Sequence, residues 1–408
     1  MDSADIVIVG GGIGGCSLGA KLASSGLTVL ILERETEFHD RVRGEWMAPW
    51  GVKELMRLDL YDAVMASSGH HISRQISYDE LATPEEAERQ SIPLNVYEGV
   101  EGPLTIEHVI LQNTAITQAA ESGCTVKRGV YKLDVTHGSD PRVRYQLNGE
   151  SLECMCRLIV GADGRTSTVR RQVGLKLEED PVDHLIVGLL IDNAHEWPED
   201  LQSIGKVGDI NYLIFPQGNG KIRLYADYDL ANRNRFSGES GAANMLSLFN
   251  MACVPNSGAI ANATPIGPCR SNPSQDAWVD NPWVEGVVLV GDAAGYNDPI
   301  LGQGLSVTLR DARIVAEILV QKTEWHSDIF LPYGEERKER LRRLRLTAQY
   351  TTTMNARFGD EAEATRARAR QRIQENPELQ TILFAAFLGP EAIDAKYFEP
   401  GFQEALFA

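Results

Sequence analysis

The spacing of hydrophobic and polar residues changes several times along the chain. Residues 6–9 (IVIV) and 28–32 (TVLIL) are nearly continuous apolar runs, which are typical of strands covered on both faces of a parallel sheet. The residues between them have a helical pattern, so the chain is expected to open as strand, helix and strand. Residues 126–160 instead form short alternating segments separated by turns, which predict an antiparallel meander inserted into the parallel fold.

Later segments repeat both kinds of pattern. Three alternating stretches between residues 184 and 230 predict a second antiparallel sheet, and residues 305–320, beyond the buried strand at 287–290, predict a helix. The tail, residues 333–408, is expected to be helical, with charged residues three and four positions apart on an exposed face. Its apolar run at 379–389 is expected to be buried against the rest of the chain or a partner subunit rather than to contact a membrane.

Composition narrows the class of protein. The chain has 408 residues, of which 43% are hydrophobic, so it can bury a substantial core. A formal net charge of −18 argues against nucleic-acid partners, which need a basic surface. No run approaches the ~20 apolar residues that span a membrane, and the first strand starts too early for a secretory signal to precede it. These features predict a soluble, cytoplasmic enzyme.

The cysteines do not form a pattern that predicts a metal site. Cys154 and Cys156 would place both thiols on one face of a strand, but no second Cys/His pair at zinc-binding spacing accompanies them. The six cysteines are therefore expected to be reduced and buried thiols.

The first chemical motif follows the first strand. Gly10, Gly12 and Gly15 have the G-x-G-x-x-G spacing of the dinucleotide-binding fingerprint, in which they allow a tight turn, close approach to a pyrophosphate and close helix–strand packing. The helix that starts here directs free N–H groups at phosphates. Glu33 ends the second strand, where a carboxylate accepts hydrogen bonds from a ribose. These residues predict a dinucleotide site, with FAD and NAD both possible.

Two further motifs lie at strand ends. The stretch "RLIVGADGRTSTVRR" joins a buried strand to Asp163-Gly164 and a helix start, where Arg165 and Arg170 would offer a second place for phosphate oxygens. The stretch "VVLVGDAAGYNDPILGQG" places Asp292 directly after another buried strand, twelve residues before the glycine at position 304. A carboxylate in this position is suited to accept hydrogen bonds from hydroxyl groups.

Together, the N-terminal fingerprint, "GADGRTSTVR" and "GDAAGYNDPILGQG" resemble, in order and spacing, the single-component (class A) FAD-dependent monooxygenases, the para-hydroxybenzoate hydroxylase-like family. The resemblance covers most of residues 5–320. It implies an α/β fold: a Rossmann-type FAD-binding domain with an inserted antiparallel substrate-binding sheet and C-terminal helices. The expected division is residues 1–75, 100–180 and 280–335 for FAD binding, 76–99 and 181–279 for substrate binding, and 336–408 for the helical region.

The resemblance also implies a role for individual residues. Asp292 would hold the ribityl hydroxyls, and Asp163 would serve both FAD and NAD(P)H. Pro299 would line the pocket above the flavin, where Gly302 and Gly304 let the backbone approach the ring. The expected cofactor-binding set is Gly10, Gly12, Ile13, Gly14, Gly15, Glu33, Arg34, Arg43, His108, Gln112, Asp163, Asp292, Pro299, Gly302, Gln303, Gly304 and Leu305.

Some of these positions have alternatives. Arg41 competes with Arg43 for the place near the flavin or its phosphates. His108 stands where the family usually has an arginine, and Gln112 lies one helical turn further on. Gly295 replaces the histidine of the more common "GDAAH".

The substrate half offers fewer chemical signals. Tyr212, Phe215 and Tyr225 are candidates for the inner face of the second sheet, although plain core packing explains each of them as well. Pro299 and Tyr212 are the candidate catalytic residues. Arg223, in a "P…G…R" segment, would meet either NAD(P)H or a surface carboxylate. His70 and His71 are possible proton carriers, with solvated histidines as the simpler interpretation.

The activity implied by the resemblance is oxygenation, typically hydroxylation, of an aromatic or polycyclic small molecule of secondary metabolism. NAD(P)H would be a transient co-substrate that reduces FAD, and O₂ would react at flavin C4a to give the hydroperoxide. The protein would be a monomer or homodimer. The alternatives are a flavin-dependent prenyl reductase, a halogenase of the same superfamily, with Lys53 near a Gly-Glu…Pro segment, and a non-catalytic flavin-binding protein.

Overall fold

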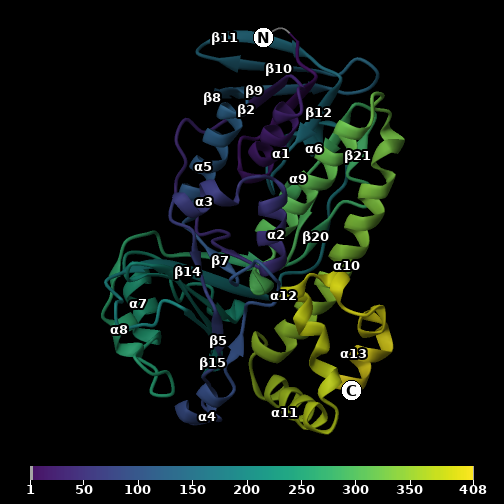
Figure 1. The fold of residues 1–408 in the computed structure, drawn as a ribbon. Coiled ribbons are helices and arrows are strands. Elements are labelled where there is room, and N and C mark those ends of the chain that lie inside the picture. The colour runs from purple at the N-terminus through teal and green to yellow at the C-terminus, as the bar shows by residue number, and fades with distance from the viewer. Residues whose placement is uncertain (1–2, 408) are drawn as a thin grey trace.

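The computed structural model describes residues 3–407 and contains two large sheets (Figure 1). The first has six strands in the order β21-β22-β12-β1-β2-β8. All neighbours are parallel except the antiparallel edge strand β21. The strands are β1 (Ile6–Val9), β2 (Val29–Glu33), β8 (Thr125–Arg128), β12 (Leu158–Gly161), β21 (Trp283–Val284) and β22 (Val287–Leu289).

The apolar run of β1 is buried because both faces of this sheet are covered. Ile6 and Ile8 belong to the core formed with α1 (Ile13–Ser24), α5 (His108–Glu121) and α9 (Gly304–Gln321). Val7 and Val9 face the opposite core, formed with the antiparallel strands β9 (Tyr131–Thr136), β10 (Arg142–Leu147) and β11 (Glu150–Met155). This two-sided burial explains why the strand reads as continuously apolar rather than alternating.

The sequence places the start of the meander too early. Residues 126–128, expected in the antiparallel meander, belong to β8, which pairs in parallel with β2. The physical reason is the helix α5 that precedes β8, because a strand–helix–strand crossover returns the chain in the same direction. The meander itself begins at β9.

The second sheet is antiparallel through its centre. Its order is β18-β14-β17-β16-β15-β5-β6, with β19 also paired to β14. One face packs against α7 (Gly241–Leu248) and α8 (Ser257–Ala261), and the other faces the rest of the molecule. The strands are β5 (Arg74–Ile76), β6 (Ile92–Pro93), β14 (His184–Asp192), β15 (Leu201–Val207), β16 (Ile210–Gly218), β17 (Lys221–Tyr228), β18 (Thr264–Pro265) and β19 (Arg270–Ser274).

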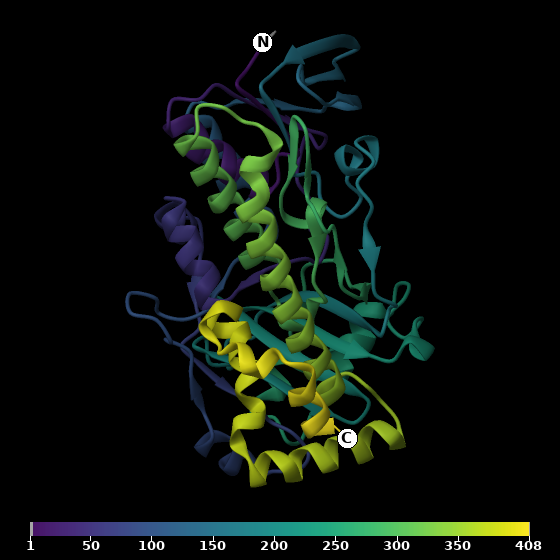
Figure 2. The ribbon, with the colours of Figure 1, turned by 90° about the vertical axis from the view of Figure 1, so that its right-hand side faces the viewer.

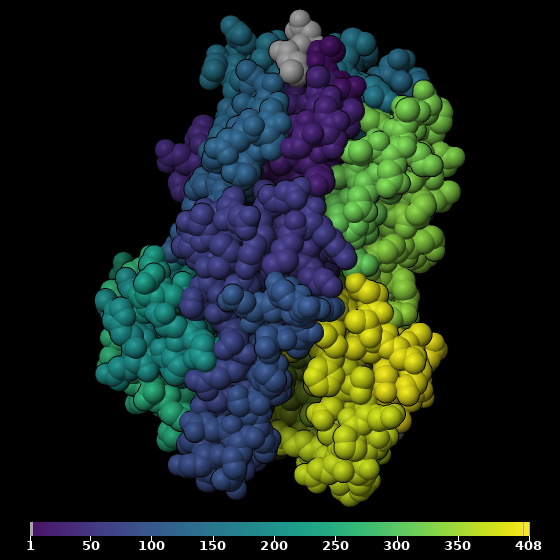
Figure 3. Space-filling view, in the orientation of Figure 1, coloured from purple at the N-terminus to yellow at the C-terminus, as the bar shows by residue number. Residues whose placement is uncertain are grey.

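The C-terminal helices join the two halves. The long helix α10 (Leu331–Asn355) runs from the first sheet toward the second, and the shorter helices fold back beside its far end (Figure 2). On the face shown in Figure 3, these helices lie beside the segment that links the two sheets, and the hydroxyl of Tyr97 donates to the carbonyl oxygen of Leu388. The helices are α11 (Asp360–Glu375), α12 (Ala385–Leu388) and α13 (Pro400–Phe407).

The exposed charged face predicted for the tail is present on α10, where Glu339 and Arg342 pair three positions apart, but it does not include every arginine of the helix. Arg337 and Arg340 are 2% and 3% exposed, because they pair with the buried carboxylate of Asp311 on α9. The boundary expected between residues 335 and 336 also falls inside this helix. Parts of the apolar run 379–389 are buried, with Ile382, Ala385 and Ala386 in the core.

The remaining elements are short. None of the helices within residues 3–407 has both the length and the apolar composition needed to cross a membrane. The short elements are β3 (Trp46–Met47), α2 (Pro49–Arg57), α3 (Tyr61–Ala66), β4 (His70–His71), α4 (Pro84–Arg89), β7 (Leu104–Thr105), α6 (Thr168–Gln172), β13 (Glu178–Glu179), β20 (Ala277–Trp278), β23 (Gly295–Tyr296) and the 3₁₀ helices η1 (Leu230–Asn232), η2 (Gly291–Ala294), η3 (Pro299–Leu301), η4 (Ser327–Phe330), η5 (Pro377–Phe384), η6 (Pro390–Ala392) and η7 (Ala395–Phe398).

Candidate functional site

The N-terminus of α1 is open to a ligand. A Cβ atom added at Gly10 would lie 2.3 Å from the carbonyl oxygen of Ala162, and one at Gly15 would lie 2.0 Å from the carbonyl oxygen of Gly10. A Cβ at Gly12 would meet nothing within 4 Å. Gly12 caps the helix without a side-chain hydrogen bond, and no acidic residue lies in the first turn. Free N–H groups and open space therefore coincide at Gly12, as an anion requires.

Glu33 lies beside this helix start. Its side chain is 8% exposed, and its two oxygens accept hydrogen bonds from the backbone N–H groups of Gly11 (2.6 Å) and Glu35 (2.7 Å). Each carboxylate oxygen has a second lone pair, so these bonds orient the group and leave acceptor capacity for a hydroxyl donor. The neighbouring Arg34 is exposed and pairs with Glu35 at 2.9 Å.

The start of α9 has the same properties as the start of α1. Gly302 has φ +67°, and a Cβ there would lie 2.8 Å from the ring of Trp46. A Cβ at Gly304 would meet nothing within 4 Å. Gln303 caps the helix without a side-chain bond to it, and no acidic residue lies in the first turn. The two helices pack closely, because a Cβ at Gly14 would lie 2.6 Å from Thr308.

Asp292 lies between these helix starts along the chain, in η2. It is half-buried, and Arg165 Nε lies 3.4 Å from its Oδ2 atom. The guanidinium of Arg165 in turn stacks over the ring of Tyr296 at 4.3 Å from the centroid. Arg43 lies close enough to interact electrostatically with both Arg165 and Asp292, whereas Arg41 pairs with Glu35 at 2.6 Å.

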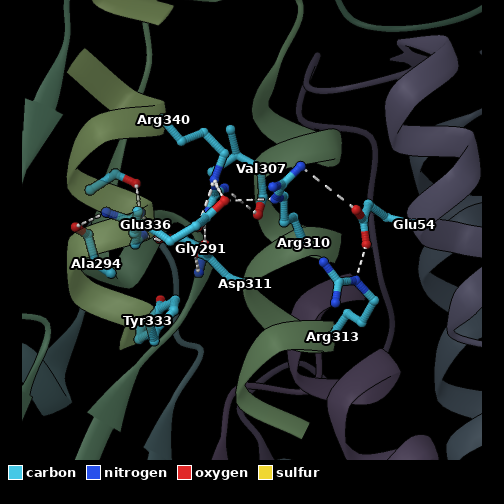
Figure 4. A network of polar contacts seen from close by, with 12 residues as sticks. Glu54, Gly291, Ala294, Val307, Arg310, Asp311, Arg313, Tyr333, Glu336 and Arg340 are labelled. Carbon is cyan, nitrogen blue, oxygen red and sulfur yellow. Dashed lines mark hydrogen bonds and ion pairs between the residues drawn. The ribbon is translucent and has the colours of Figure 1, made fainter. Parts of the chain in front are cut away.

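A buried ionic network holds the loop that carries Asp292 (Figure 4). Arg337 of α10 donates to the carbonyl oxygens of Gly291 (3.2 Å), Ala294 (3.0 Å) and Gly295 (3.0 Å). Arg337 also pairs with Asp311 at 2.9 Å, and Asp311 accepts from the N–H of Gly291 at 2.9 Å. The network thus forms hydrogen bonds with both the carbonyl oxygens and an N–H group of the loop backbone.

Arg340 and Tyr333 extend the same network. Arg340 lies 2.7 Å from the second oxygen of Asp311, and the hydroxyl of Tyr333 donates to the carbonyl oxygen of Leu289 at 2.9 Å. Burial alone would raise the pKa of Asp311, but the two guanidinium groups hold that pKa below its usual value. Sequence reasoning missed these residues, because charges three positions apart on a helix also describe a solvated face.

Most polar side chains of the "GADGRTSTVR" motif form hydrogen bonds with other protein groups. The carboxylate of Asp163 accepts from Ser167 Oγ (2.5 Å) and from the N–H of Thr168 (2.6 Å), so it helps to cap α6. Arg170 is 5% exposed and donates to the carbonyl oxygens of Ala293 (2.8 Å) and Arg165 (2.8 Å). Of this motif, Arg165 is the residue that reaches Asp292.

The segment around residues 40–45 is anchored to the second sheet. Arg223 is fully buried and binds Glu45 at 2.5 and 2.7 Å and Asp40 at 2.9 Å. Arg223 therefore meets carboxylates, but Glu45 is buried, whereas the sequence left open a carboxylate at the surface. Val42, a β-branched residue, has φ +55°, with its N–H bonded to Asp40 at 2.7 Å. Such a backbone conformation is strained and needs this kind of support.

His108 and Gln112 lie at the start of α5, next to this segment. His108 Nδ1 lies 3.0 Å from the carbonyl oxygen of Gly44, and desolvation lowers the pKa of the imidazole, which favours the neutral ring. Gln112 is half-buried one turn further along. A neutral histidine donates or accepts hydrogen bonds but supplies no charge for a phosphate.

The three substrate-side candidates fall on two faces of the second sheet. Phe215 and Tyr225 face an apolar cluster around Trp46, with ring centroids 5.9 Å apart for Trp46 and Phe215 and 6.2 Å apart for Phe215 and Tyr225. Phe387 of α12 packs edge-on against Trp46 at 6.0 Å. Tyr212 lies on the opposite face, fully buried beside α7, where its hydroxyl donates to the carbonyl oxygen of Tyr78 at 2.8 Å. Its position favours a structural role.

The remaining candidates lie around this cluster. Pro299 begins η3, and the next two residues, Ile300 and Leu301, belong to the apolar cluster. Leu305 and Ile13 are buried in the core between α1 and α9. His70 and His71 are half-buried in β4, with ring nitrogens 2.7 Å from the carbonyl oxygen of Glu199 and 3.0 Å from the hydroxyl of Tyr61.

A basic cleft of about 500 Å³ adjoins Arg43. Arginines from three segments line it, together with small polar residues and one aromatic ring. The lining residues are Arg41, Arg43, Arg233, Phe236, Ser237, Gly238, Cys269, Arg270, Ser271 and Asn272. Four arginines in one cleft of a chain with a net charge of −18 indicate a place for an anionic group.

These residues fit FAD. The open space at Gly12 and Gly304 lies at two uncapped helix N-termini, which stabilise negative charge. Glu33 and Asp292 add carboxylates, the acceptors that ribose and ribityl hydroxyls need. A cofactor with a pyrophosphate, a sugar alcohol and a ring that carries negative charge when reduced matches this donor and acceptor set.

Comparison with known families gives the same cofactor. A family model described as "FAD binding domain" matches residues 3–224, and one described as "Squalene epoxidase" matches residues 155–331. Squalene epoxidase 3 of Arabidopsis thaliana is 24% identical over 329 residues, which cover 77% of this chain and 60% of that protein. Menaquinone reductase of Mycolicibacterium smegmatis is 25% identical over 334 residues, which cover 78% and 76%.

The chain spans 54% to 60% of the length of the squalene epoxidases that it matches. Among solved structures, p-nitrophenol 4-monooxygenase of Pseudomonas putida superposes with a TM-score of 0.73 at 17% identity, covering 100% of this chain and 98% of that one. The flavin-dependent brominase Bmp2 superposes with a TM-score of 0.74 at 16% identity, covering 99% and 98%. At these identities the likeness concerns the fold.

Proposed function

The chain belongs to the FAD-binding domain family, and we propose that it is an FAD-dependent monooxygenase that uses NAD(P)H and O₂ to hydroxylate, or otherwise oxygenate, an aromatic or polycyclic small molecule. The observation that carries the proposal is the pair of uncapped, glycine-lined helix starts at Gly12 and Gly304, with the carboxylates of Glu33 and Asp292. NAD alone would not require the second helix start or the second carboxylate.

The residues divide the binding of FAD between them. The N–H groups at Gly12 would bind the pyrophosphate, Glu33 a ribose and Asp292 the ribityl hydroxyls. The N-terminus of α9 would stabilise negative charge at the ring by about 0.3–2 kcal/mol. When bound, FAD supplies the hydride acceptance and the oxygen activation, and the protein supplies position, dryness and charge.

The basic cleft supports a transient visit by NAD(P)H. Four arginines converge there from three segments: Arg41 and Arg43 from the N-terminal part of the chain, Arg233 from the end of η1 and Arg270 from β19. Guanidinium groups bind phosphate oxygens with paired, charge-assisted hydrogen bonds. Arg43 lines the cleft and also interacts electrostatically with Asp292. A dinucleotide phosphate bound in the cleft would therefore lie beside the flavin site.

The apolar cluster supports a hydrophobic substrate. Trp46 packs against Gly302 at the start of α9, and Phe215, Tyr225 and Phe387 extend the aromatic surface around it. Aromatic side chains favour aromatic and polycyclic partners through stacking and apolar contact. The curated relatives are named for squalene and menaquinone, which are both apolar molecules.

The first experiment tests the cofactor and the reaction together. The protein is purified with added FAD, and bound flavin is measured from its absorbance. NAD(P)H oxidation and O₂ consumption are then followed with aromatic, polycyclic and polyprenyl compounds, and products are analysed by mass spectrometry. We expect stimulated NAD(P)H oxidation, one O₂ consumed per turnover and a product heavier by one oxygen. A protein that does not bind FAD would end the proposal.

A flavin-dependent prenyl reductase is the second candidate, favoured by the similarity to menaquinone reductase over most of both chains. It would yield a product heavier by two hydrogens without O₂. A halogenase would need halide and add a halogen to the product. Lys53 is the lysine near the Gly-Glu…Pro segment that the halogenase hypothesis involves. Its ammonium group lies over the ring of Tyr97, 4.1 Å from the centroid. A non-catalytic flavoprotein would bind FAD and show no substrate-stimulated NAD(P)H oxidation.

A further inference from the structure

A histidine and two carboxylates meet where the second sheet packs against the loop that precedes η3. His184 of β14 is fully buried, as is Asp227 of β17, and Asp298 is 5% exposed. His184 Nε2 lies 3.5 Å from Asp227 Oδ1 and 3.8 Å from Asp298 Oδ1. Asp298 directly precedes η3, so the contact joins the substrate-side sheet to the loop that leads into α9.

The surroundings of these three side chains are also polar. Asn211 of β16 donates to Asp227 at 2.7 Å, and Ser274 of β19 is the register partner of His184. Asp276 accepts from the N–H of Asp298 at 3.1 Å and from Asn297 at 3.0 Å. A buried polar cluster thus extends across four strands and two loops.

Several polar atoms of this cluster have no hydrogen-bond partner among residues 3–407. They are both ring nitrogens of His184, Asp227 Oδ1, Asn211 Oδ1, Ser274 Oγ and Asn297 Oδ1. An unsatisfied buried polar atom costs about 1–3 kcal/mol. The presence of six such atoms in one cluster indicates that ordered water or a shared proton satisfies their hydrogen bonding.

The charges around the cluster favour retention of a proton. Burial raises the pKa of Asp298 to about 7 and that of Asp276 to about 6, with His184 acting in the opposite direction on Asp298. Burial alone would lower the pKa of His184, but Asp227 and Asp298 raise it. Of the outer groups, Asp183 of the β13–β14 connection acts on His184, while Asp180 and Arg345 of α10 act on Asp276.

Asp298 connects this cluster to the proposed flavin site. Its Oδ1 atom accepts from the N–H of Ile300 at 3.0 Å and so caps η3. Ile300 is followed by Leu301, which belongs to the apolar cluster around Trp46. Gly302 comes next and has the left-handed conformation that leads into the open start of α9. A change in the charge of Asp298 therefore acts on the short loop at the mouth of that helix.

We propose that His184 and Asp298 together hold one proton, here called the shared proton, as a buried ion pair with Nε2 3.8 Å from Oδ1, and that the pair positions the loop of residues 299–302 against the start of α9. The role rests on the proposed function, because that loop borders the flavin ring only if FAD binds as argued. His184 and Asp298 are positioning residues in this scheme. Loss of the shared proton leaves the carboxylate of Asp298 charged beside the buried carboxyl groups of Asp227 and Asp276 and loosens the loop.

The test uses Asp298→Asn, which keeps an oxygen for the N–H of Ile300 but cannot ionise. In the FAD-loaded protein we expect a change in the visible flavin spectrum between pH 6 and 8 and a matching change of about tenfold in turnover. In Asp298→Asn that pH dependence disappears while FAD still binds. The control is Asp209→Asn, since Asp209 is exposed between β15 and β16 and pairs with Arg235. A variant that keeps the wild-type pH profile overturns the proposal.

Nitrogen NMR of histidine-labelled apoprotein separates this inference from the proposed function. A shared proton protects one histidine ring N–H from exchange and shifts its nitrogens from those of a free imidazole, and the signal is lost in His184→Gln. This NMR measurement needs no flavin. It therefore tests whether the proton is shared even if the protein does not bind FAD. The absence of such a histidine in the wild-type protein contradicts the proposal even if the variants fail to fold.

Discussion

Arg337 Nη1 lies 3.0 Å from the carbonyl oxygen of Ala294, and this bond joins the C-terminal helix α10 to the loop of Asp292. The same guanidinium binds the carbonyl oxygens of Gly291 and Gly295 on the N-terminal and C-terminal sides of the loop. The C-terminal helices are thus part of the framework of the candidate site, although they follow the three motifs in sequence.

The first prediction concerns this framework. Arg337→Met removes the three carbonyl contacts and leaves Asp311 with Arg340 as its remaining guanidinium partner. We expect the FAD affinity to fall about tenfold or more, because small displacements of a binding group have large effects. Flavin titration measures the affinity, and thermal unfolding of the apoprotein measures the stability.

The control for Arg337 is Arg342→Met on the same helix. Arg342 is partly exposed, pairs with Glu339 at 2.7 Å and donates to the carbonyl oxygen of Phe398 at 3.1 Å, away from the loop of Asp292, so its removal is expected to lower stability and leave FAD affinity unchanged. Arg337→Lys keeps the charge but not the fork of donors, and an intermediate affinity is expected. Loss of stability with unchanged FAD affinity would give Arg337 a purely structural role.

Local motifs predicted the candidate dinucleotide site because each depends on a short stretch of backbone. Gly10, Gly12 and Gly15 and the strand-end carboxylates lie within a few residues of the elements they serve, so the spacing alone places them. Arg337 depends on how α10 packs against α9, and its spacing is equally typical of a solvated helix. The sequence also offered Tyr212 and Phe215 as candidates for the same inner face of the second sheet. An odd spacing along a strand puts them on opposite faces, and of the two only Phe215 lies beside Trp46.

The second prediction separates glycines that the fold needs from glycines that the ligand needs. In Gly12→Ala the new methyl group meets no protein atom within 4 Å, and the backbone φ of −76° suits alanine. The apoprotein is expected to fold normally, while FAD affinity falls about tenfold or more, because the methyl group keeps the pyrophosphate from approaching the backbone N–H groups closely. Gly15→Ala instead places the methyl group 2.0 Å from the carbonyl oxygen of Gly10 and is expected to destabilise the apoprotein.

Thermal unfolding of both apoproteins and flavin titration of Gly12→Ala provide the comparison. Equal effects of the two substitutions on apoprotein stability would argue that the space at Gly12 is not a binding space.

The third prediction tests the basic cleft. Arg270 is exposed on β19 and lines the cleft together with Arg41, Arg43 and Arg233. Arg270→Met is expected to raise KM for NAD(P)H about tenfold, because a charge-assisted hydrogen bond to phosphate contributes about 1.5–3 kcal/mol. FAD affinity is expected to stay unchanged. KM in the wild-type protein is expected to rise with salt concentration.

A matched control for the cleft is Arg235→Met. Arg235 pairs with Asp209 at 2.7 Å and is not among the residues that line the cleft. Steady-state kinetics at several salt concentrations measure KM for NAD(P)H in both variants. A normal KM in Arg270→Met, or an equal increase in Arg235→Met, would contradict a nucleotide site in the cleft.

The fourth prediction assigns substrate selectivity to the C-terminal segment. Phe387 packs against Trp46, and the neighbouring carbonyl oxygen of Ala386 accepts from Gln303 at 3.1 Å. Phe387→Ala opens space beside Trp46 and is expected to shift kcat/KM about tenfold in favour of bulkier substrates. The control is Phe384→Ala, because Phe384 is 45% exposed. Identical substrate profiles for the two variants and the wild type would exclude Phe387 from the substrate site.

The fifth prediction concerns the pH dependence of stability. Burial raises the pKa of Asp276 from an ordinary 3.8 to about 6. Between these two pH values the folded protein holds a proton that the unfolded chain has released, so the free energy of unfolding falls as pH rises through this window. The contribution is complete below pH 3.8, is lost by about pH 6, and amounts to about 3 kcal/mol.

Asp276→Asn removes this titration and keeps an oxygen for the N–H of Asp298 and for Asn297. Relative to the wild type, the variant is therefore expected to gain stability as pH rises from 4 to 7. Denaturant unfolding at intervals of half a pH unit measures the difference, and Asp280→Asn, an exposed acid on the same segment, is expected to show no such trend. A variant whose stability runs parallel to the wild type across the window would show that Asp276 is ionised in the folded protein at pH 4, and that the polar cluster holds its proton elsewhere.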